Sequence, residues 1–202
     1  MVSPSNAAQV VAPAQKGAAA CGLLAELCTL LMTEGVPADI LGEIICTVGE
    51  IIRGCRSNQD AFGQVMAHGA SPPRTALVVL LMSMVNEKQP VALRAAVLYC
   101  FQCFVHKNDS SQTQIVQALL PTSAEAVQVI SAGQLLCGGL FSQDPLTHWF
   151  SAVALSHSLV GNNNSKELLL RVHLAISREA PPVSLIQQTF AILQQVRFLL
   201  FF

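Results

Sequence analysis

Two cysteines and a histidine are the residues best placed for chemistry in this sequence. Cys100 and Cys103 form a C-x-x-C pair, and His106 follows three residues later. Cysteine and histidine side chains are the usual protein ligands of zinc, and C-x-x-C pairs also carry redox chemistry. However, the sequence has no second C-x-x-C or H-x-x-x-H pair, and Phe101 and Phe104 alternate with the thiols. The pattern favours buried cysteines that pack as small apolar residues. A metal- or redox-active helical protein remains the alternative.

Hydrolytic and phosphate-binding chemistry have little support. There is no G-x-S-x-G motif, and Ser156 and His157 are adjacent on an expected helix, where neighbours point in different directions. Gly133, Gly138 and Gly139 flank a helix and do not open one after a strand, so they predict close helix packing. We therefore expect a protein that is not an enzyme and that has no catalytic residue, cofactor or metal.

The composition narrows the possible partners. Only 11% of the residues are charged, against roughly 25% in an average soluble domain, and the formal net charge is −1. The chain has no basic run, so nucleic acid is not an expected partner. The longest apolar run, residues 76–85, is too short to span a membrane, so we expect only indirect membrane association. Seven irregularly spaced cysteines favour reduced thiols and a cytoplasmic location.

Three prolines mark a long internal repeat. Pro37, Pro90 and Pro145 stand 53 (90 − 37) and 55 (145 − 90) residues apart, and each opens a long stretch with apolar residues at helical spacing. A repeat of this length predicts an α-solenoid, in which similar helical units stack on one another.

The units share one plan: a helix, a long apolar helix and a shorter polar helix. The expected helices are 18–34, 37–54 and 57–68, then 74–85, 90–105 and 110–120, then 127–141, 145–160 and 165–177. Another helix starts at Ser184, and Ser57 is the expected N-cap of the first short helix. The prediction is an all-α, armadillo-like α-solenoid of about three repeats plus a terminal helix, with HEAT-like helix pairs as the alternative. Its expected divisions are a flexible lead-in (1–17), the repeat region (18–195) and a divergent apolar C-terminus (196–202).

The short polar helices are the expected interaction surface. In armadillo-type stacks the last helix of each unit tends to line the concave face that grips partners. The candidate protein-interaction residues are Gln59, Gln64, Gln112, Gln114, Gln117, Lys166 and Arg171. The alternative is a solvated face without specificity, which would make the chain a purely structural spacer within a larger solenoid.

Several strings in these helices resemble one known family. They are VPADIL (36–41), IIRGC (51–55), VVLLMSMVNE (78–87), LYCFQCF (98–104), SAGQLLCGGLFS (131–142) and PPVSL (181–185). In this order, and without large gaps from about Cys21 to Gln195, they resemble the globular head of the general vesicular transport factor family. Members of this family tether vesicles on the route from the endoplasmic reticulum to the Golgi. After Gln195 the sequence VRFLLFF leaves the family pattern.

The resemblance implies a function that the residue patterns alone do not. It implies an armadillo-like head that docks Rab GTPases, SNAREs and other golgins or tethering-complex subunits before membrane fusion. It also implies that the full-length protein is a homodimer with a coiled coil and an acidic tail. The expected location is cytoplasmic, peripheral on Golgi and transport-vesicle membranes. This chain has neither a heptad region nor an acidic tail, so we expect a fragment of the head. The family offers no catalytic residue to carry over.

Overall fold

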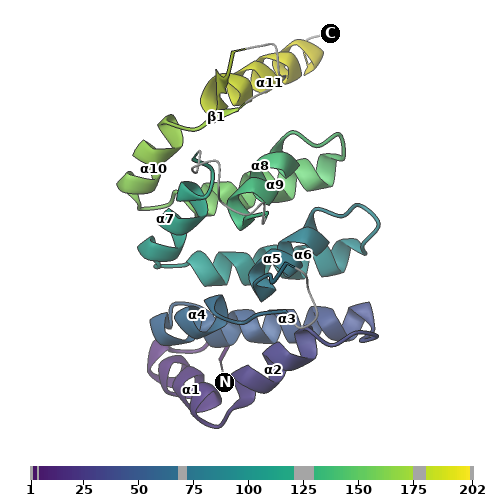
Figure 1. The fold of residues 1–202 in the computed structure, drawn as a ribbon. Coiled ribbons are helices and arrows are strands. Elements are labelled where there is room, and N and C mark those ends of the chain that lie inside the picture. The colour runs from purple at the N-terminus through teal and green to yellow at the C-terminus, as the bar shows by residue number, and fades with distance from the viewer. Residues whose placement is uncertain (1, 4, 68–71, 121–129, 175–180, 201–202) are drawn as a thin grey trace.

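The computed structural model describes residues 2–3, 5–67, 72–120, 130–174 and 181–200, without the side chains of 195–200. Within these ranges the chain is almost entirely helical and forms an elongated stack (Figure 1). The helices are α1 (Ala8–Ala20), α2 (Leu23–Leu31), α3 (Ala38–Ile52), α4 (Arg56–Gly63), α5 (Ala76–Met84), α6 (Val91–Val105), α7 (Asp109–Gln117), α8 (Ala132–Leu140), α9 (Pro145–His157), α10 (Asn163–Leu170) and α11 (Leu185–Leu200). Two-residue strands, β1 (His173–Leu174) and β2 (Val183–Ser184), pair antiparallel between α10 and α11. The predicted all-α solenoid is confirmed.

The stack consists of three units of three helices each: α2–α4, α5–α7 and α8–α10. The long middle helices α3, α6 and α9 lie against one another, and each packs on the first helix of its own unit. Their facing side chains form one continuous core, in which Val48, Ile52 and Phe101 are fully buried. Each such side chain contributes about 1.5–3 kcal/mol when it leaves water, so burial along the middle helices dominates the stability of the stack.

Small residues set how closely the helices approach. A Cβ atom added to Gly49 of α3 would lie 3.4 Å from the Cys100 Cα of α6. On α8, the corresponding atoms at Gly133 and Gly139 would collide with the Ile115 carbonyl oxygen and the Ser151 hydroxyl. The predicted packing role is therefore confirmed for Gly133 and Gly139, whereas Gly138 has nothing within 4 Å.

The prolines start the middle helices as predicted. Pro37 and Pro90 are the N-cap residues of α3 and α6, and Pro145 is the first residue of α9, behind the capping carboxylate of Asp144. Proline suits the start of a helix because its missing N–H would have no partner there.

The middle helices also end alike. Gly54, Lys107 and Gly161 occupy equivalent positions with φ of 68°, 52° and 72°, and Lys107 is the one non-glycine with positive φ in the described ranges.

Several predicted boundaries were wrong. Residues 8–20 form α1 where a flexible lead-in was expected, and the predicted helix 18–34 is interrupted at Gly22, whose φ is 81°. Ser57 lies inside α4, whose N-cap is Cys55 without a side-chain hydrogen bond. The helix predicted over 165–177 stops at Leu170, and the chain continues into β1. The start of the helix expected at 127 and the side chains of 196–202 lie outside the described residues.

One buried cation joins the second and third units. Arg94 of α6 is 2% exposed and donates from Nε to the Met84 carbonyl at 2.8 Å. Its Nη2 donates to the Asp144 carboxylate at 2.8 Å and to the Thr147 hydroxyl at 2.7 Å, and its guanidinium lies 5.2 Å from the centre of the Phe150 ring. The hydrogen bonds from Arg94 to Asp144 and Thr147 link α6 to the start of α9. A buried guanidinium is costly without acceptors, so these bonds stabilise the contact between the two helices.

The link between Arg94 and Asp144 predicts a loss of stability in acid. Hydrogen bonds from Thr147 and from the Arg94 guanidinium hold the pKa of Asp144 well below its ordinary value of 3.8. A carboxyl with a depressed folded-state pKa stabilises the fold above its unfolded-state pKa and loses that contribution as pH falls towards its folded-state pKa. We expect the urea midpoint of the unmodified protein to decrease once the pH is below about 4. The midpoint of Asp144→Asn is expected to be lower at pH 7 and to decrease less in acid. Equal pH dependence of the two proteins would contradict this expectation.

Candidate functional site

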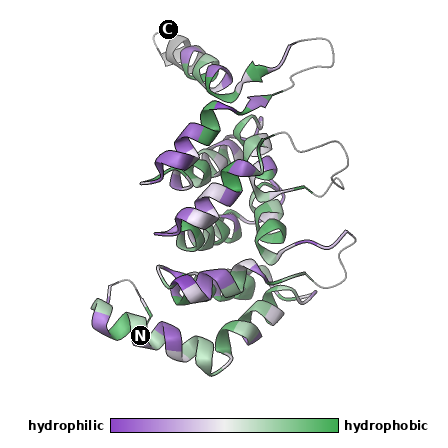
Figure 2. Ribbon diagram, turned by 60° about the vertical axis from the view of Figure 1, so that its left-hand side comes forward, coloured by the Kyte–Doolittle hydropathy of each residue, from purple (hydrophilic) through white to green (hydrophobic). Residues whose placement is uncertain are grey.

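The short helices α4, α7 and α10 stack along one side of the molecule, and polar residues gather along them (Figure 2). Their sequences predict this placement, because each carries few apolar residues for the core. Asn108 and Asn162 start α7 and α10 by accepting hydrogen bonds from the backbone N–H groups of Ser111 and Ser165, both at 3.0 Å. These caps fix where α7 and α10 begin.

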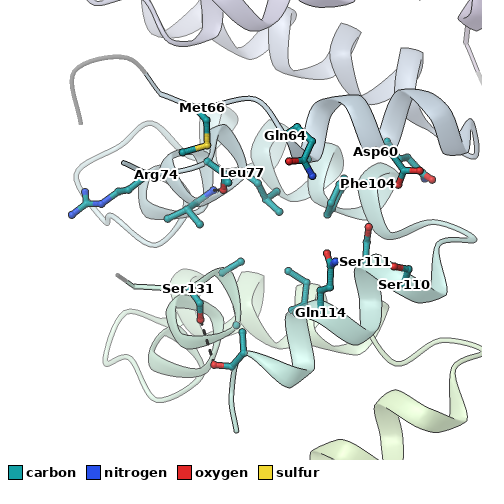
Figure 3. Close-up of a pocket in the computed structure, with 18 of the residues that line it drawn as sticks. Asp60, Gln64, Met66, Arg74, Leu77, Phe104, Ser110, Ser111, Gln114 and Ser131 are labelled. Carbon is teal, nitrogen blue, oxygen red and sulfur yellow. Dashed lines mark hydrogen bonds between the residues drawn. The ribbon is translucent and has the colours of Figure 1, made fainter. Parts of the chain in front are cut away.

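Between α4 and α7 lies a groove of about 460 Å³, here called the inter-unit groove (Figure 3). Gln64 of the first unit and Gln114 of the second point toward one another across it. Its remaining lining includes Asp60, Leu77, Phe104, Ser110, Ser111, Ile115 and Ser131, together with Met66 and Ile130. Met66 and Ile130 are 44% and 45% exposed, so the groove combines solvent-exposed apolar side chains with hydrogen-bonding groups. This combination is typical of surfaces that bind other proteins.

The charges around the groove are few. Asp60 is paired with Arg56 of the same helix at 3.0 Å, and both side chains are exposed. Arg74 points away from the groove and donates from Nη1 to the Met82 sulfur at 3.5 Å. Among the lining residues that the structure describes, there is no cluster of cationic side chains of the kind that binds phosphate groups.

Two of the predicted interaction residues have a different role in the structure. The Gln59 amide is buried and donates to the carbonyls of Cys103 and His106, both at 2.9 Å. The Gln112 amide is also buried and donates to the carbonyls of His157 and Val160, both at 3.1 Å. In each case a short helix of one unit satisfies the carbonyls where the middle helix of the next unit ends. A partner could reach these amides only by breaking those bonds.

The remaining five predicted residues are exposed. Gln64 and Gln114 line the inter-unit groove, whereas Gln117, Lys166 and Arg171 lie on the surface outside it. Sequence reasoning missed the exposed apolar residues of the groove, Met66 and Ile130, because it placed them inside the expected helices 57–68 and 127–141, whereas α4 ends at Gly63 and α8 begins at Ala132. It also missed the buried asparagines Asn108 and Asn162, although their spacing of 54 residues (162 − 108) follows the repeat.

A third glutamine completes the pattern of buried amides. Gln15 of α1 donates to the carbonyls of Glu50 and Arg53 at 2.8 and 2.9 Å, at the end of α3. We call Gln15, Gln59 and Gln112 the glutamine ladder. Asn108 and Asn162 support it, because each donates at 3.1 Å to the side-chain oxygen of the glutamine before it, Gln59 and Gln112 respectively.

The C-x-x-C pair does not form a reactive site. Cys100 and Cys103 are buried in the core, and burial raises the pKa of Cys103 to about 12 and that of Cys100 well above its ordinary value. Burial therefore favours the neutral thiol over the thiolate at both residues. Among the described residues, no three His, Cys, Asp or Glu side chains form a group able to hold a metal ion, so His106 does not complete a site. The buried apolar role predicted for these cysteines is confirmed.

Comparison with known proteins identifies the family. Residues 56–197 match the head region of the Uso1/p115-like vesicle tethering proteins, and residues 1–40 match the armadillo tether-repeat of vesicular transport factor. The chain belongs to the Uso1/p115-like vesicle tethering family. It is 58% identical over 196 residues to the general vesicular transport factor p115 of rat (Rattus norvegicus) and of human (Homo sapiens). The alignment covers 96% of this chain and 20% of each relative, so the chain spans about a fifth of their length.

The glutamine ladder predicts a large loss of stability when one of its members is removed. Gln59→Ala deletes donors to one buried and one partly buried carbonyl and leaves Asn108 without one of its acceptors. We expect the free energy of unfolding to fall by about 2–3 kcal/mol, because unsatisfied buried polar groups cost about 1–3 kcal/mol each. Chemical denaturation of Gln59→Ala and of the exposed control Gln117→Ala measures the change in the free energy of unfolding of each variant. A Gln59→Ala change as small as that of the control, within about 0.5 kcal/mol, would refute the structural role.

Proposed function

We propose that this chain is a non-enzymatic protein-interaction module of a vesicle tether in endoplasmic reticulum–Golgi and intra-Golgi transport. The observation that carries the proposal is the family match over residues 56–197, with 58% identity to the vesicular transport factor p115. In this proposal the module works from the cytoplasm at Golgi and transport-vesicle membranes. It attaches there through proteins, and no helix in the described ranges is both long enough and apolar enough to span a membrane.

The inter-unit groove is the proposed docking surface for those partners. It lies between two units of a rigid stack, so its opposite walls are held in place by the core and by the glutamine ladder. A rigid groove loses little conformational entropy on binding, which favours recognition of a protein segment. Gln64 and Gln114 offer amide donors and acceptors on opposite walls, and Met66 and Ile130 offer apolar contacts at the edges.

The proposed partners are those that the family resemblance implies: a Rab GTPase, a SNARE or another golgin or tethering-complex subunit. The same resemblance implies homodimers of the full-length protein. The competing proposal is a purely structural spacer, in which the groove binds no partner. The two proposals differ in whether changes at the groove edge alter any interaction of the chain.

Direct binding of purified partners to groove variants separates these proposals. Immobilised chain is exposed in turn to a Golgi Rab GTPase loaded with a non-hydrolysable GTP analogue, to Golgi SNARE proteins and to golgin fragments. We expect one class to bind and the double variant Met66→Asp/Ile130→Asp to weaken it at least about tenfold, because two apolar contacts are replaced by charge. Both residues are already about half exposed, so the fold is expected to tolerate the changes.

The matched control is Val10→Asp/Val91→Asp, which introduces the same two charges at residues that are 47% and 53% exposed and outside the groove. It is expected to bind as the unmodified chain does. Absence of binding by every class, or equal binding by the groove variant and the control, would contradict docking at the inter-unit groove.

A further inference from the structure

A second pocket opens between the second and third units, where α6 and α9 end. We call it the histidine pocket; its volume is about 460 Å³, and its lining shares no residue with that of the inter-unit groove. His106 and Lys107 follow the last residue of α6, and His157 is the last residue of α9. Asp109, the first residue of α7, is the one carboxylate among the lining residues that the structure describes.

The basic side chains at this edge of the stack have few partners within the chain. His106 is half-buried and packs on the end of α3, because a Cβ atom added to Gly54 would lie 3.5 Å from its Cδ2. Within the described ranges, no hydrogen bond or ion pair engages the His106 ring, the Lys107 ammonium group or the Arg53 guanidinium. These groups are therefore available to a ligand.

The charges closest to His106 are all positive. Burial lowers the pKa of His106, and the charges of Arg53, Lys107 and His157 lower it further. An anion in the pocket would relieve this repulsion and favour the protonated imidazole.

The other charged groups near this edge have partners inside the stack. Arg56 of α4 is paired with Asp60 at 3.0 Å and donates to the Asn108 side-chain oxygen. Glu50 of α3 accepts a hydrogen bond from the Tyr99 hydroxyl. Neither Arg56 nor Glu50 lines the pocket.

The backbone at Lys107 favours a role for its side chain. The equivalent positions hold Gly54 and Gly161, and Lys107 adopts the same left-handed conformation, with φ of 52°. This conformation costs energy for a residue with a Cβ atom, whereas glycine adopts it freely. A residue kept there in spite of the strain is a candidate for function.

His157 is oriented so that one ring nitrogen serves the fold and the other lies free of the backbone. Its Nδ1 lies 2.9 Å from the Val153 carbonyl oxygen and therefore carries a proton, because a carbonyl only accepts. Its Nε2 lies 3.3 Å from the Gln102 amide nitrogen, and Gln102 also lines the pocket. When the ring is protonated, the Nε2–H group is a donor for an anion in the pocket.

We propose that the histidine pocket binds an acidic segment of another protein, whose carboxylate pairs with Lys107, His106 and His157. The pocket is large enough for several residues, and Val160, which is 65% exposed, offers an apolar contact to the methylene groups of a glutamate. A phosphate group fits less well, because Asp109 repels a dianion more strongly than a single carboxylate and no arginine is among the described lining residues. The proposal does not depend on docking at the inter-unit groove.

A fluorescein-labelled hexaglutamate peptide tests the proposal, with hexaglutamine as its control. Fluorescence anisotropy with the full 202-residue chain is expected to show saturable binding of hexaglutamate alone, weaker as salt is added. Binding should strengthen as the pH is lowered from about 7.5 to about 5.5, because the imidazoles gain protons while the glutamates stay ionised above about pH 4.3. By linkage, bound hexaglutamate should raise the pKa of His106, which NMR of its ring C–H groups measures.

Variants test where the carboxylate binds. Lys107→Gly should weaken binding at least about fivefold by removing a charged donor, whereas Lys107→Arg should stay within about twofold of the unmodified chain. The urea midpoint of Lys107→Gly should be equal or higher, because glycine relieves the strain at this position. Asp109→Asn should strengthen binding about twofold or more by removing a like charge. Lys88→Ala, at an exposed lysine outside the pocket, should bind as the unmodified chain does.

Several results would overturn the proposal. They are absence of saturable hexaglutamate binding, equal binding by Lys107→Gly and Lys88→Ala, and weaker binding by Asp109→Asn. A lowered urea midpoint of Lys107→Gly would assign the lysine to the fold. Tighter binding of inorganic phosphate or of phosphoinositide vesicles than of hexaglutamate would assign the pocket to phosphate groups in place of an acidic protein segment.

Discussion

A helix that ends inside a protein leaves carbonyl groups without partners, and this stack depends on how those groups are satisfied. At the ends of α3, α6 and α9 the donors come from glutamines of α1, α4 and α7, respectively. One amide reaches two carbonyls, so it fixes both the distance and the rotation between neighbouring units. Apolar burial makes the units adhere, but burial alone tolerates small shifts. The hydrogen bonds of the glutamine ladder select one arrangement among them.

This constraint gives α4 and α7 a buried and an exposed polar side. Gln59 and Gln112 face inward and belong to the stack, whereas Gln64 and Gln114 face the inter-unit groove and remain available for binding. In the proposed docking role, substitutions at the groove would alter recognition without loosening the units. The same division explains why a polar helix lies beside an apolar core, because the buried amides of Gln59 and Gln112 find partners at the end of the next middle helix, and that of Asn58 finds them at Gln15 and Ile51.

The sequence allowed the helices and their repeat to be predicted, but not their connections. Pro37, Pro90 and Pro145 marked the middle helices because helix starts follow local rules. Helix α1 was missed because its stability comes from a distant contact, that of Gln15 with the end of α3. The roles of Gln59 and Gln112 were missed for a related reason. A glutamine on a polar helix looks the same in sequence whether it meets water or the buried end of another helix.

The coupling between Gln112 and Asn162 tests the central claim most directly, because these residues lie on different units and meet at 3.1 Å. A double-mutant cycle compares the free energies of unfolding of Gln112→Ala, Asn162→Ala and the double variant. A ladder that joins the units predicts a coupling energy of about 1 kcal/mol or more, because the second substitution removes a contact that the first has already broken. Additive effects, within about 0.3 kcal/mol, would show that this contact does not couple the units and would contradict the account.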